Sequence, residues 1–576
     1  MKSKTNLILV AGAILMLLFF LFPSTKKEQQ DPSQLASFGA IKCTVAKFLL
    51  EGVDTTQQIS PLFENLGNLH FPISTSEERA QEFFDQGLKL TFAFNHAEAH
   101  RSFMEASRLD PNAAMTYWGQ AYALGPNIND PLPLDDRKLK YNEALEKAKK
   151  WAEGASPMEQ ALINALTSRY STDLSKDVGE LNTAYMNAMA EVVKQFPEDA
   201  DVQTLYAASV MNTVPWNYWD KDGNPAANIA AAKRALEKAM EINPDHPGAH
   251  HYYIHMVELP QPDLAIPSAE KLGGLMPAAG HIVHMPSHIY IRVGRYQDAV
   301  SANIAAILAD EDYISQCYSQ GMYPLGYYPH NIHFLWSAAS LLGDSDMAIN
   351  AAKKTAEKVP VGELLEMPFL QNFASVPLLS YVRFGKWNEI LTTPSPNSGI
   401  KHLKLIWHYA RGIAFIRKNN PKEAQEELDA IQEMLADPDL ENLIAAGFDS
   451  SKTIAELAYQ VVAGELHALK GDLKKAQEHL EKAVAIEDGL TYTEPAAWYI
   501  PTRQNLGAIL LKAQKPEEAE KIYKEDLELL RQNGWSLMGL YNSLVAQGKM
   551  DEALKIKKEY DKAWEHADID INNSVL

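Results

Sequence analysis

Histidines are concentrated in one part of this 576-residue chain. Nine of the 17 histidines fall between residues 246 and 333, a far higher density than in the rest of the sequence. They are His246, His250, His251, His255, His281, His284, His288, His330 and His333. Neutral imidazole is a common ligand of transition metals, so this concentration predicts metal chemistry.

The histidines lie in three short stretches, within which they recur at intervals of three or four residues, joined by Glu258 in the first stretch. Side chains at these intervals share one face of a helix. We therefore predict one pocket that binds a transition metal. Its predicted ligands are His250 or His251, His255, Glu258, His281, His284, His288, His330 and His333.

The donor set suits zinc, copper, iron or manganese, because it is built of imidazoles with one carboxylate. Cys43 and Cys317 are too few for a thiolate zinc site and leave room for one disulfide. No His-Glu-x-x-His metalloprotease motif is present. Pro286 stands between His284 and His288 and is expected to kink their helix. Predicted outer-shell tyrosines are Tyr252, Tyr253, Tyr290 and Tyr328.

Two other interpretations of the histidines stay open. In one, the imidazoles join Arg292 and Arg295 to bind an anionic small molecule or a peptide carboxylate. In the other, each histidine is a structural polar residue with ordinary hydrogen bonds. Ordinary nucleotide and acyl-transfer chemistries have no support, since the chain lacks a glycine-rich phosphate loop and a Gly-x-Ser-x-Gly nucleophile motif.

Weaker candidates lie outside the histidine-rich window. Asn127, Asn129 and Asp130 form a polar loop that could reach the pocket, and His96 is expected to stabilise a turn. Arg503, Glu494 and Asn533 are further weak candidates that could equally be solvated groove residues. Large aromatic residues such as Trp216 are expected to fill gaps between repeats.

The segments that carry these residues are predicted to be helices. Runs rich in Ala, Leu, Glu and Lys recur with helical spacing and are separated by turn signals, and no long segment alternates with period two. A ladder of small and large residues also recurs along the chain. Clear copies are Gly87, Ala99, Phe103, Ala106 and Pro111; Ala232, Leu236, Ala239 and Pro244; Gly412, Ala424 and Leu428; Gly464, Ala476, Leu480 and Ala483; and Gly507, Ala519 and Tyr523.

This ladder resembles the tetratricopeptide repeat. The resemblance implies an all-α solenoid of helix hairpins, a right-handed superhelix whose groove is lined by the first helix of each pair and holds a peptide or partner protein. Ala265, Ala299 and Ala348 fit the second helices, which places the three histidine stretches on first helices. Residues 94–99, 117–119, 125–129 and 215–219 also resemble a group of membrane-anchored or exported bacterial repeat proteins to which no biochemical role is attached.

The sequence divides into five parts. The apolar run Leu7–Phe22 and Pro23 predict an N-terminal anchor helix or signal segment (1–23), and the absence of a small-residue cleavage site favours a retained anchor. A polar tether (24–59), an N-terminal array (60–245), a histidine-rich middle (246–345) and a C-terminal array (346–576) follow. The export signal predicts a body outside the cytoplasm, periplasmic in a Gram-negative cell.

The charge balance excludes one class of partner. The chain has 53 Lys and Arg against 74 Asp and Glu, a formal net charge of −21. Binding to a nucleic-acid backbone depends on clustered Lys and Arg, so DNA and RNA are not expected partners.

Overall fold

The computed structural model describes residues 56–220, 222–316 and 323–576. All of them belong to one unit, which spans Val45–Leu576. The predicted anchor, most of the predicted tether, Cys43 and Cys317 lie outside the described residues. Within those ranges no helix combines the length and apolar character that a membrane span requires.

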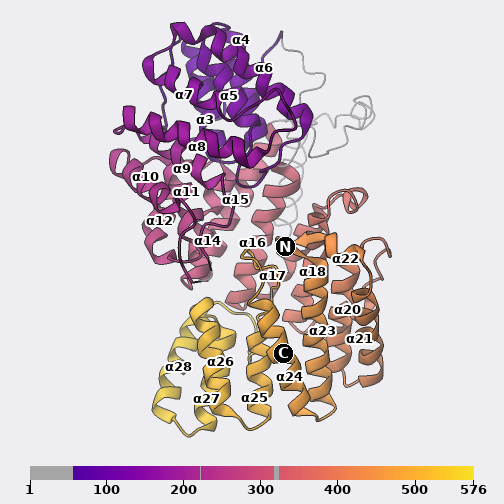
Figure 1. The fold of residues 1–576 in the computed structure, drawn as a ribbon. Helices are drawn as coiled ribbons and strands as arrows, with labels where there is room; N and C mark the ends of the chain where they lie inside the picture. Colours follow the sequence, from indigo (N-terminus) through magenta and orange to yellow (C-terminus); the bar gives the residue numbers. More distant parts are fainter. Residues whose placement is uncertain (1–55, 221, 317–322) are drawn as a thin grey trace, which may run out of the picture. The chain divides into compact units, whose positions relative to one another are not determined.

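The described chain is built of helices, as the periodicity predicted (Figure 1). The helices up to the histidine-rich middle are α3 (Glu78–Phe92), α4 (His96–Leu109), α5 (Ala114–Leu124), α6 (Asp135–Trp151), α7 (Pro157–Thr167), α8 (Val178–Gln195), α9 (Ala200–Met211) and α10 (Ile229–Ile242). The middle contains α11 (Pro247–Val257), α12 (Ile266–Leu275), α13 (Gly280–His284), α14 (Pro286–Arg292), α15 (Tyr296–Gln316), α16 (Tyr328–Leu342) and α17 (Ser345–Glu357).

The C-terminal part continues the same pattern. Its helices are α18 (Phe369–Arg383), α19 (Trp387–Thr392), α20 (Lys401–Arg417), α21 (Pro421–Leu435), α22 (Asp439–Asn442), α23 (Ser451–Leu469), α24 (Leu473–Glu487), α25 (Thr502–Lys512), α26 (Pro516–Leu529), α27 (Gly534–Ala546) and α28 (Met550–Ala563). The short strands β1 (Ile444–Ala446) and β2 (Asp449–Ser450) form an antiparallel pair between α22 and α23. These five residues are the strand content of the described ranges, so the expectation of little strand is confirmed.

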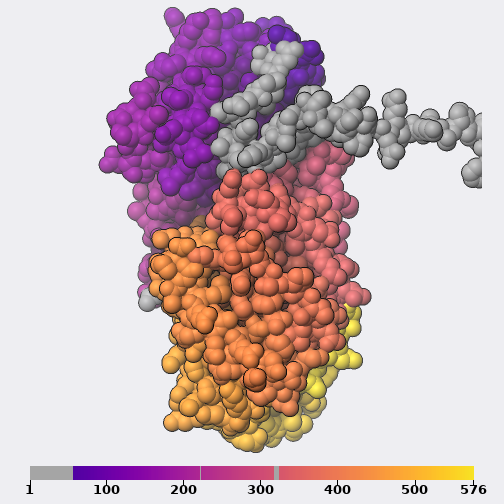
Figure 2. All heavy atoms as spheres, turned by 90° about the vertical axis from the view of Figure 1, so that its right-hand side faces the viewer, coloured from indigo at the N-terminus to yellow at the C-terminus, as the bar shows by residue number. Residues whose placement is uncertain are grey.

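Consecutive helices pair along the chain as hairpins. Helix α3 packs on α4, α16 on α17, α23 on α24 and α27 on α28, and each hairpin also contacts the next one. In the space-filling view, the colour changes gradually over the surface, so segments that follow one another in the sequence lie against one another (Figure 2). Each hairpin therefore buries its apolar face against a neighbour, which is the packing principle of a helical repeat array.

The predicted ladder explains how closely the hairpins approach. A Cβ on Gly87 or Gly119 would lie 2.6 or 2.4 Å from the ring of Phe103, and Gly507 and Gly539 stand in the same relation to Tyr523. Each ring of α4 and α26 thus fits between glycines of the helices before and after it. A side chain at either glycine would collide with the ring, so the small residues set the spacing between helices.

Local signals place the helix ends. Asn95 accepts a hydrogen bond from the Glu98 N–H at the start of α4, and Asp344 caps α17 in the same way through Met347. Such side-chain oxygens satisfy N–H groups that have no partner inside the helix. Helix α16 ends at Leu342 and is followed by Gly343, whose φ of +83° is the left-handed conformation that glycine adopts without strain.

Candidate metal centre

The three histidine stretches lie on the first helices of three successive pairs, as predicted. They are α11, which packs on α12; α13 and α14, which pack on α15; and α16, which packs on α17. The second histidine stretch is divided into α13 and α14, and α14 begins at Pro286, so the predicted kink is present. Pro286 has no N–H to donate to the carbonyl of Ile282 one turn earlier, and next to it the buried Ser287 hydroxyl donates to the carbonyl of His284 at 2.7 Å.

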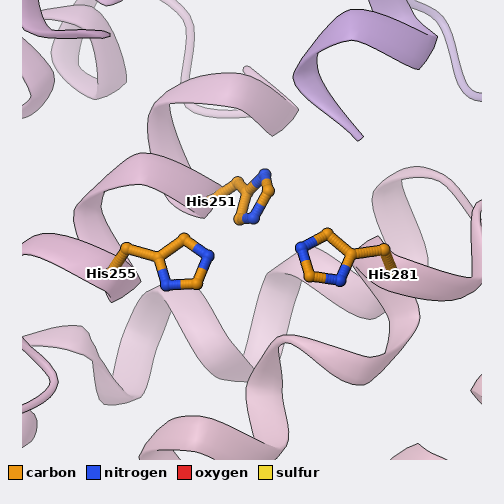
Figure 3. A group of neighbouring side chains, drawn as sticks. All are labelled: His251, His255 and His281. Atoms are coloured by element: carbon orange, nitrogen blue, oxygen red, sulfur yellow. The ribbon is translucent and has the colours of Figure 1, made fainter. Parts of the chain in front are cut away.

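His251, His255 and His281 form the first group, which we call triad A. The rings of His251 and His255 on α11 face the ring of His281 on α13 across a small space (Figure 3). One nitrogen from each ring can be chosen so that all three lie within 4.8 Å of one another. Three donors at this separation can converge on one metal ion after small ring rotations.

Triad A contains nitrogens that lack hydrogen-bond partners. The Nδ1 of His251 donates to the Phe92 carbonyl oxygen at 2.6 Å, which leaves its Nε2 as a free acceptor. That Nε2 and both nitrogens of His255 and His281 are buried without a partner. Buried polar atoms are normally satisfied, since each unpaired one costs about 1–3 kcal/mol. Each neutral ring has one lone pair, so these five nitrogens offer three lone pairs to one space, which indicates a site for a ligand that accepts them.

His284, His288 and His330 form a second group, triad B. Nitrogens of these three rings also lie within 4.8 Å of one another. The Nδ1 of His284 lies 2.7 Å from Oδ1 of Asn303, whose amide N–H donates to the Ala299 carbonyl. Because this bond fixes the amide, His284 must donate through Nδ1 and present the lone pair of Nε2. That Nε2 lies 3.0 Å from Nε2 of His288.

Glu258 lies between the two triads. Its Oε1 is 3.6 Å from Nδ1 of His255, and its Oε2 is 2.7 Å from Nδ1 of His288. Both are ion-pair contacts that are not aligned well enough for a hydrogen bond, and only 1% of the residue is exposed. Burial would raise the pKa of Glu258, but the imidazoles of His288 and His255 hold it at about 2.

Burial keeps four of the imidazoles neutral. Desolvation lowers the pKa of His251, His281 and His284 well below the usual value, and neighbouring imidazoles lower it further. The pKa of His330 is lowered for the same reasons. Neutral rings offer a lone pair, so these four imidazoles are in their metal-binding protonation state at neutral pH.

Triad A, triad B and Glu258 together are called the cluster. A cavity of about 650 Å³ lies beside it. His255 and His281 of triad A and His288 and His330 of triad B form part of its wall. Much of the remaining lining is apolar and includes Ile128, Leu132, Pro215, Trp216, Phe373 and Phe448. Leu132 and Phe448 are 72% and 50% exposed, so the apolar lining continues to the protein surface.

Two predicted ligands do not join the cluster. His250 lies against Ser268 and Pro244: its Nδ1 accepts from the Ser268 hydroxyl and its Nε2 donates to the Pro244 carbonyl, each at 2.9 Å. Its hydrogen-bonding capacity is therefore used. His333 stacks on Trp336 with a ring-centre separation of 5.1 Å and belongs to neither triad.

The structure also places the weaker candidates Asn127, Asn129 and His96 relative to the cavity. The loop at Asn127 does reach the cavity, and Asn129 donates to the Tyr327 hydroxyl at 2.9 Å. His96 also lines the cavity with both nitrogens unpaired, whereas the turn beside it is capped by Asn95. The expected turn-stabilising role of His96 is therefore not supported by a hydrogen bond of its ring.

The predicted outer-shell tyrosines mostly serve other contacts. The hydroxyls of Tyr253 and Tyr328 donate to Glu237 and Glu311, and Tyr290 stacks under Arg295. Only Tyr252 contacts the cluster, with its ring stacked 5.7 Å from that of His251. Arg295 itself is paired with Glu270 and Asp298, which disfavours it as an anion ligand.

Three further lining residues were not among the predicted metal ligands. Phe94, in the left-handed conformation at the turn between α3 and α4, places its ring 4.4 Å from His251 and 5.4 Å from His281. Trp216 meets His255 edge to face at 5.0 Å instead of only filling a gap between repeats. Glu494 lines the cavity and accepts a hydrogen bond from Tyr492, so it is not a freely solvated side chain.

Comparisons with known proteins give no identity. No protein-family model matches the chain, and no curated protein matches it. Solved structures are similar at low levels. The human IFIT1 dimer with m7Gppp-AAAA is 14% identical with a TM-score of 0.32, covering 78% of this chain and 90% of that one.

Two other solved structures are similar to the same degree. Yeast Tom70 is 15% identical with a TM-score of 0.28 and covers 83% of this chain and 90% of its own. The APC/C hetero-tetramer Cut9–Hcn1 is 13% identical with a TM-score of 0.29, and the match covers 86% of this chain and 77% of that one. Similarity at this level carries no functional argument, so the architecture is assigned from the hairpins and glycine contacts of this chain.

Proposed function

We propose that the protein binds a transition metal through the clustered imidazoles and exposes it to a small molecule in the adjoining cavity. The observation that carries this proposal is the set of buried triad A nitrogens that lack a hydrogen-bond partner, beside the buried carboxylate of Glu258. An apolar core residue would fill the same space without the cost of desolvating an imidazole. A metal ion accepts these lone pairs and removes that cost.

The number of ligands favours a reactive site over a purely structural one. Structural zinc sites are usually closed by four protein ligands, whereas catalytic sites hold three and keep a position open. Each group in which all donors approach one another within 4.8 Å has three members in the described residues. The open position would face the cavity, so a metalloenzyme acting on an apolar or partly apolar molecule is the function that we favour.

The proposed location outside the cytoplasm depends on the apolar run Leu7–Phe22. Membrane fractionation of the full chain and of a version lacking residues 1–23 tests both the anchor and the location. A full-length preparation whose mature N-terminus lies near residue 24 would identify a cleaved signal instead.

Metal analysis of the purified full chain is the decisive experiment. We expect about one or more equivalents of a first-row metal, or uptake of that amount when the apoprotein is reconstituted with Zn(II), Cu(II), Fe(II) or Mn(II). His281→Gln should lower the content. His250→Asn is the matched control, because His250 is buried beside His251 but already hydrogen-bonded. Less than about a tenth of an equivalent, with no uptake on reconstitution, contradicts the proposal.

A second candidate function is supported by the exposed apolar residues at the cavity. Leu132 and Phe448 present large apolar side chains to solvent, and such residues beside a cavity suit an apolar peptide side chain or protein partner. In this case the histidines would be structural. A pull-down with the full chain would then recover a partner whose binding survives EDTA and is lost in Leu132→Ser with Phe448→Ser.

A further inference from the structure

The two triads share no residue. Triad A combines His251, His255 and His281, and triad B combines His284, His288 and His330. Ligand atoms of one first-row metal ion lie no more than about 4.4 Å apart, twice a bond of about 2.0–2.2 Å. In the described residues, no group of donors that all lie within 4.8 Å of one another has more than three members, and a third such group, His255, Glu258 and His288, joins the two triads. One ion therefore cannot bind all six imidazoles.

From this arrangement we infer that the cluster is a dinuclear centre, with one first-row metal ion held by triad A and a second held by triad B. The inference rests on the proposed function, which requires only one ion. It assigns two adjacent metal positions, each formed by three imidazoles. Imidazole donors suit zinc, copper, iron and nickel.

The contact between His284 and His288 supports an ion in triad B. His284 presents the lone pair of Nε2, because its Nδ1 donates to Asn303. The Nε2 of His288 is only 3.0 Å away, so a proton or a cation must lie between the two nitrogens. Two nitrogens bound to one metal at about 2.1 Å, with angles of about 90–109°, are separated by about 3.0–3.4 Å. The observed separation falls at the edge of this range.

Glu258 connects the two positions. One carboxylate oxygen faces Nδ1 of His255 in triad A, and the other faces Nδ1 of His288 in triad B. When His255 and His288 direct Nδ1 to the carboxylate, each of these two rings directs its Nε2 toward the ion of its own triad. A carboxylate behind a metal-binding histidine fixes the ring and increases its basicity. Glu258 would serve one histidine of each triad in this way.

The cavity places both ions against the same molecule. Its wall contains two histidines of triad A and two of triad B, so an open position on each ion would face the same space. Paired metal ions at short separation act as a clamp on one substrate and stabilise charge on two of its atoms. The ligand class that this favours is a small molecule with two adjacent donor atoms and an apolar remainder.

Counting metal ions tests the inference. Native mass spectrometry of the full chain, loaded separately with Zn(II) and Cu(II) and freed of excess metal, should show two ions per chain for at least one metal. H251A/H281A should retain one ion, and so should H284A/H330A. The control H70A/H566A removes two histidines outside the cluster whose side chains are 58% and 49% exposed, and it should retain two.

Electron paramagnetic resonance of the Cu(II) form gives a second readout. Two nearby Cu(II) ions interact magnetically, so the wild-type signal should integrate to clearly less than two spins, whereas each double variant should give one full spin. If the alanine pairs fail to fold by circular dichroism, the pairs H251Q/H281Q and H284Q/H330Q provide the same counts.

The outcomes separate this inference from the proposed function. One ion in the wild type that is lost in both double variants overturns the dinuclear centre and leaves the proposed metal function intact. Two ions in every variant overturn it as well, because the ions would then lie elsewhere. No bound ion with either metal contradicts both proposals.

Discussion

Asp310 occupies the space into which a side chain at Gly280 would extend, since a Cβ on Gly280 would lie 1.9 Å from its Oδ1. The Asp310 carboxyl group is fully buried and accepts hydrogen bonds from the Tyr323 hydroxyl and the Asn331 amide, both at 2.7 Å. Burial raises its pKa to about 7. Asp310 on α15 therefore fixes both α13, which begins at Gly280, and α16, which carries His330.

We expect Gly280→Ala to weaken metal binding although residue 280 is not a ligand. The new Cβ would push α13 away from Asp310 and displace His281 and His284 from their partners on α11 and α16. Misplacing such donors should lower metal affinity at least about 10-fold, measured by competition with a chelator. Gly274→Ala on α12 is the control, because a Cβ there meets nothing within 4 Å. Equal affinities for the two variants would contradict this account of Gly280.

Buried histidines predict acid sensitivity of the apoprotein. Desolvation lowers the pKa of His333 to about 3 and that of His402 to about 4, against about 6.5 in an unfolded chain. Below pH 6.5 the unfolded chain binds protons that the folded protein does not, so stability falls as the pH falls toward these lower values. Each such histidine contributes a slope of about 1.4 kcal/mol per pH unit.

Urea unfolding of the apoprotein between pH 7 and pH 5 measures this slope. His402→Asn, which lies outside the cluster, should reduce the slope between pH 6 and pH 5 by about 1.4 kcal/mol per pH unit. His566→Asn is the control, because that side chain is 49% exposed. Stability that is constant or increases on acidification would show that these histidines are not held neutral.

The fold could be predicted from the sequence because its determinants are local. Gly87 and Phe103 are separated by one hairpin, and their contact recurs between Gly507 and Tyr523 with the same spacing. A contact that depends on a fixed separation leaves a periodic trace in the sequence. The same regularity places the histidine stretches on successive first helices.

The composition of the site could be predicted only in part. Helical spacing identifies the residues that share a face, but it cannot show whether other polar groups already satisfy a histidine. His250 is excluded by Ser268 and Pro244 through contacts that depend on how α11 packs, and His251 is oriented by the carbonyl of Phe92, 159 residues away in sequence. Contacts of this kind depend on tertiary packing and have no regular spacing.

The glycine contacts predict a specific cost to the fold. Gly87→Ala would place a Cβ 2.6 Å from the ring of Phe103, a buried side chain with little room to move. Overpacking of this kind costs about 1–3 kcal/mol, so the midpoint of urea unfolding should fall. Gly274→Ala should instead leave stability unchanged or raise it by up to about 1 kcal/mol, because alanine is the better helix former. Similar midpoints for the two variants would contradict the assigned role of Gly87.

Glu258→Gln should weaken both proposed metal positions without removing a ligand from either. The carboxylate faces His255 and His288 with separate oxygens, and a neutral amide cannot increase the basicity of two rings at once. Loss of such an outer partner typically lowers metal affinity about 10- to 100-fold, so chelator competition should show both binding steps weakened while two ions still bind at saturation. Glu494→Gln is the matched control, since Glu494 lines the same cavity but contacts neither triad through a hydrogen bond or ion pair. Complete loss of one ion in Glu258→Gln, with the other affinity unchanged, would identify Glu258 as a direct ligand of a single position.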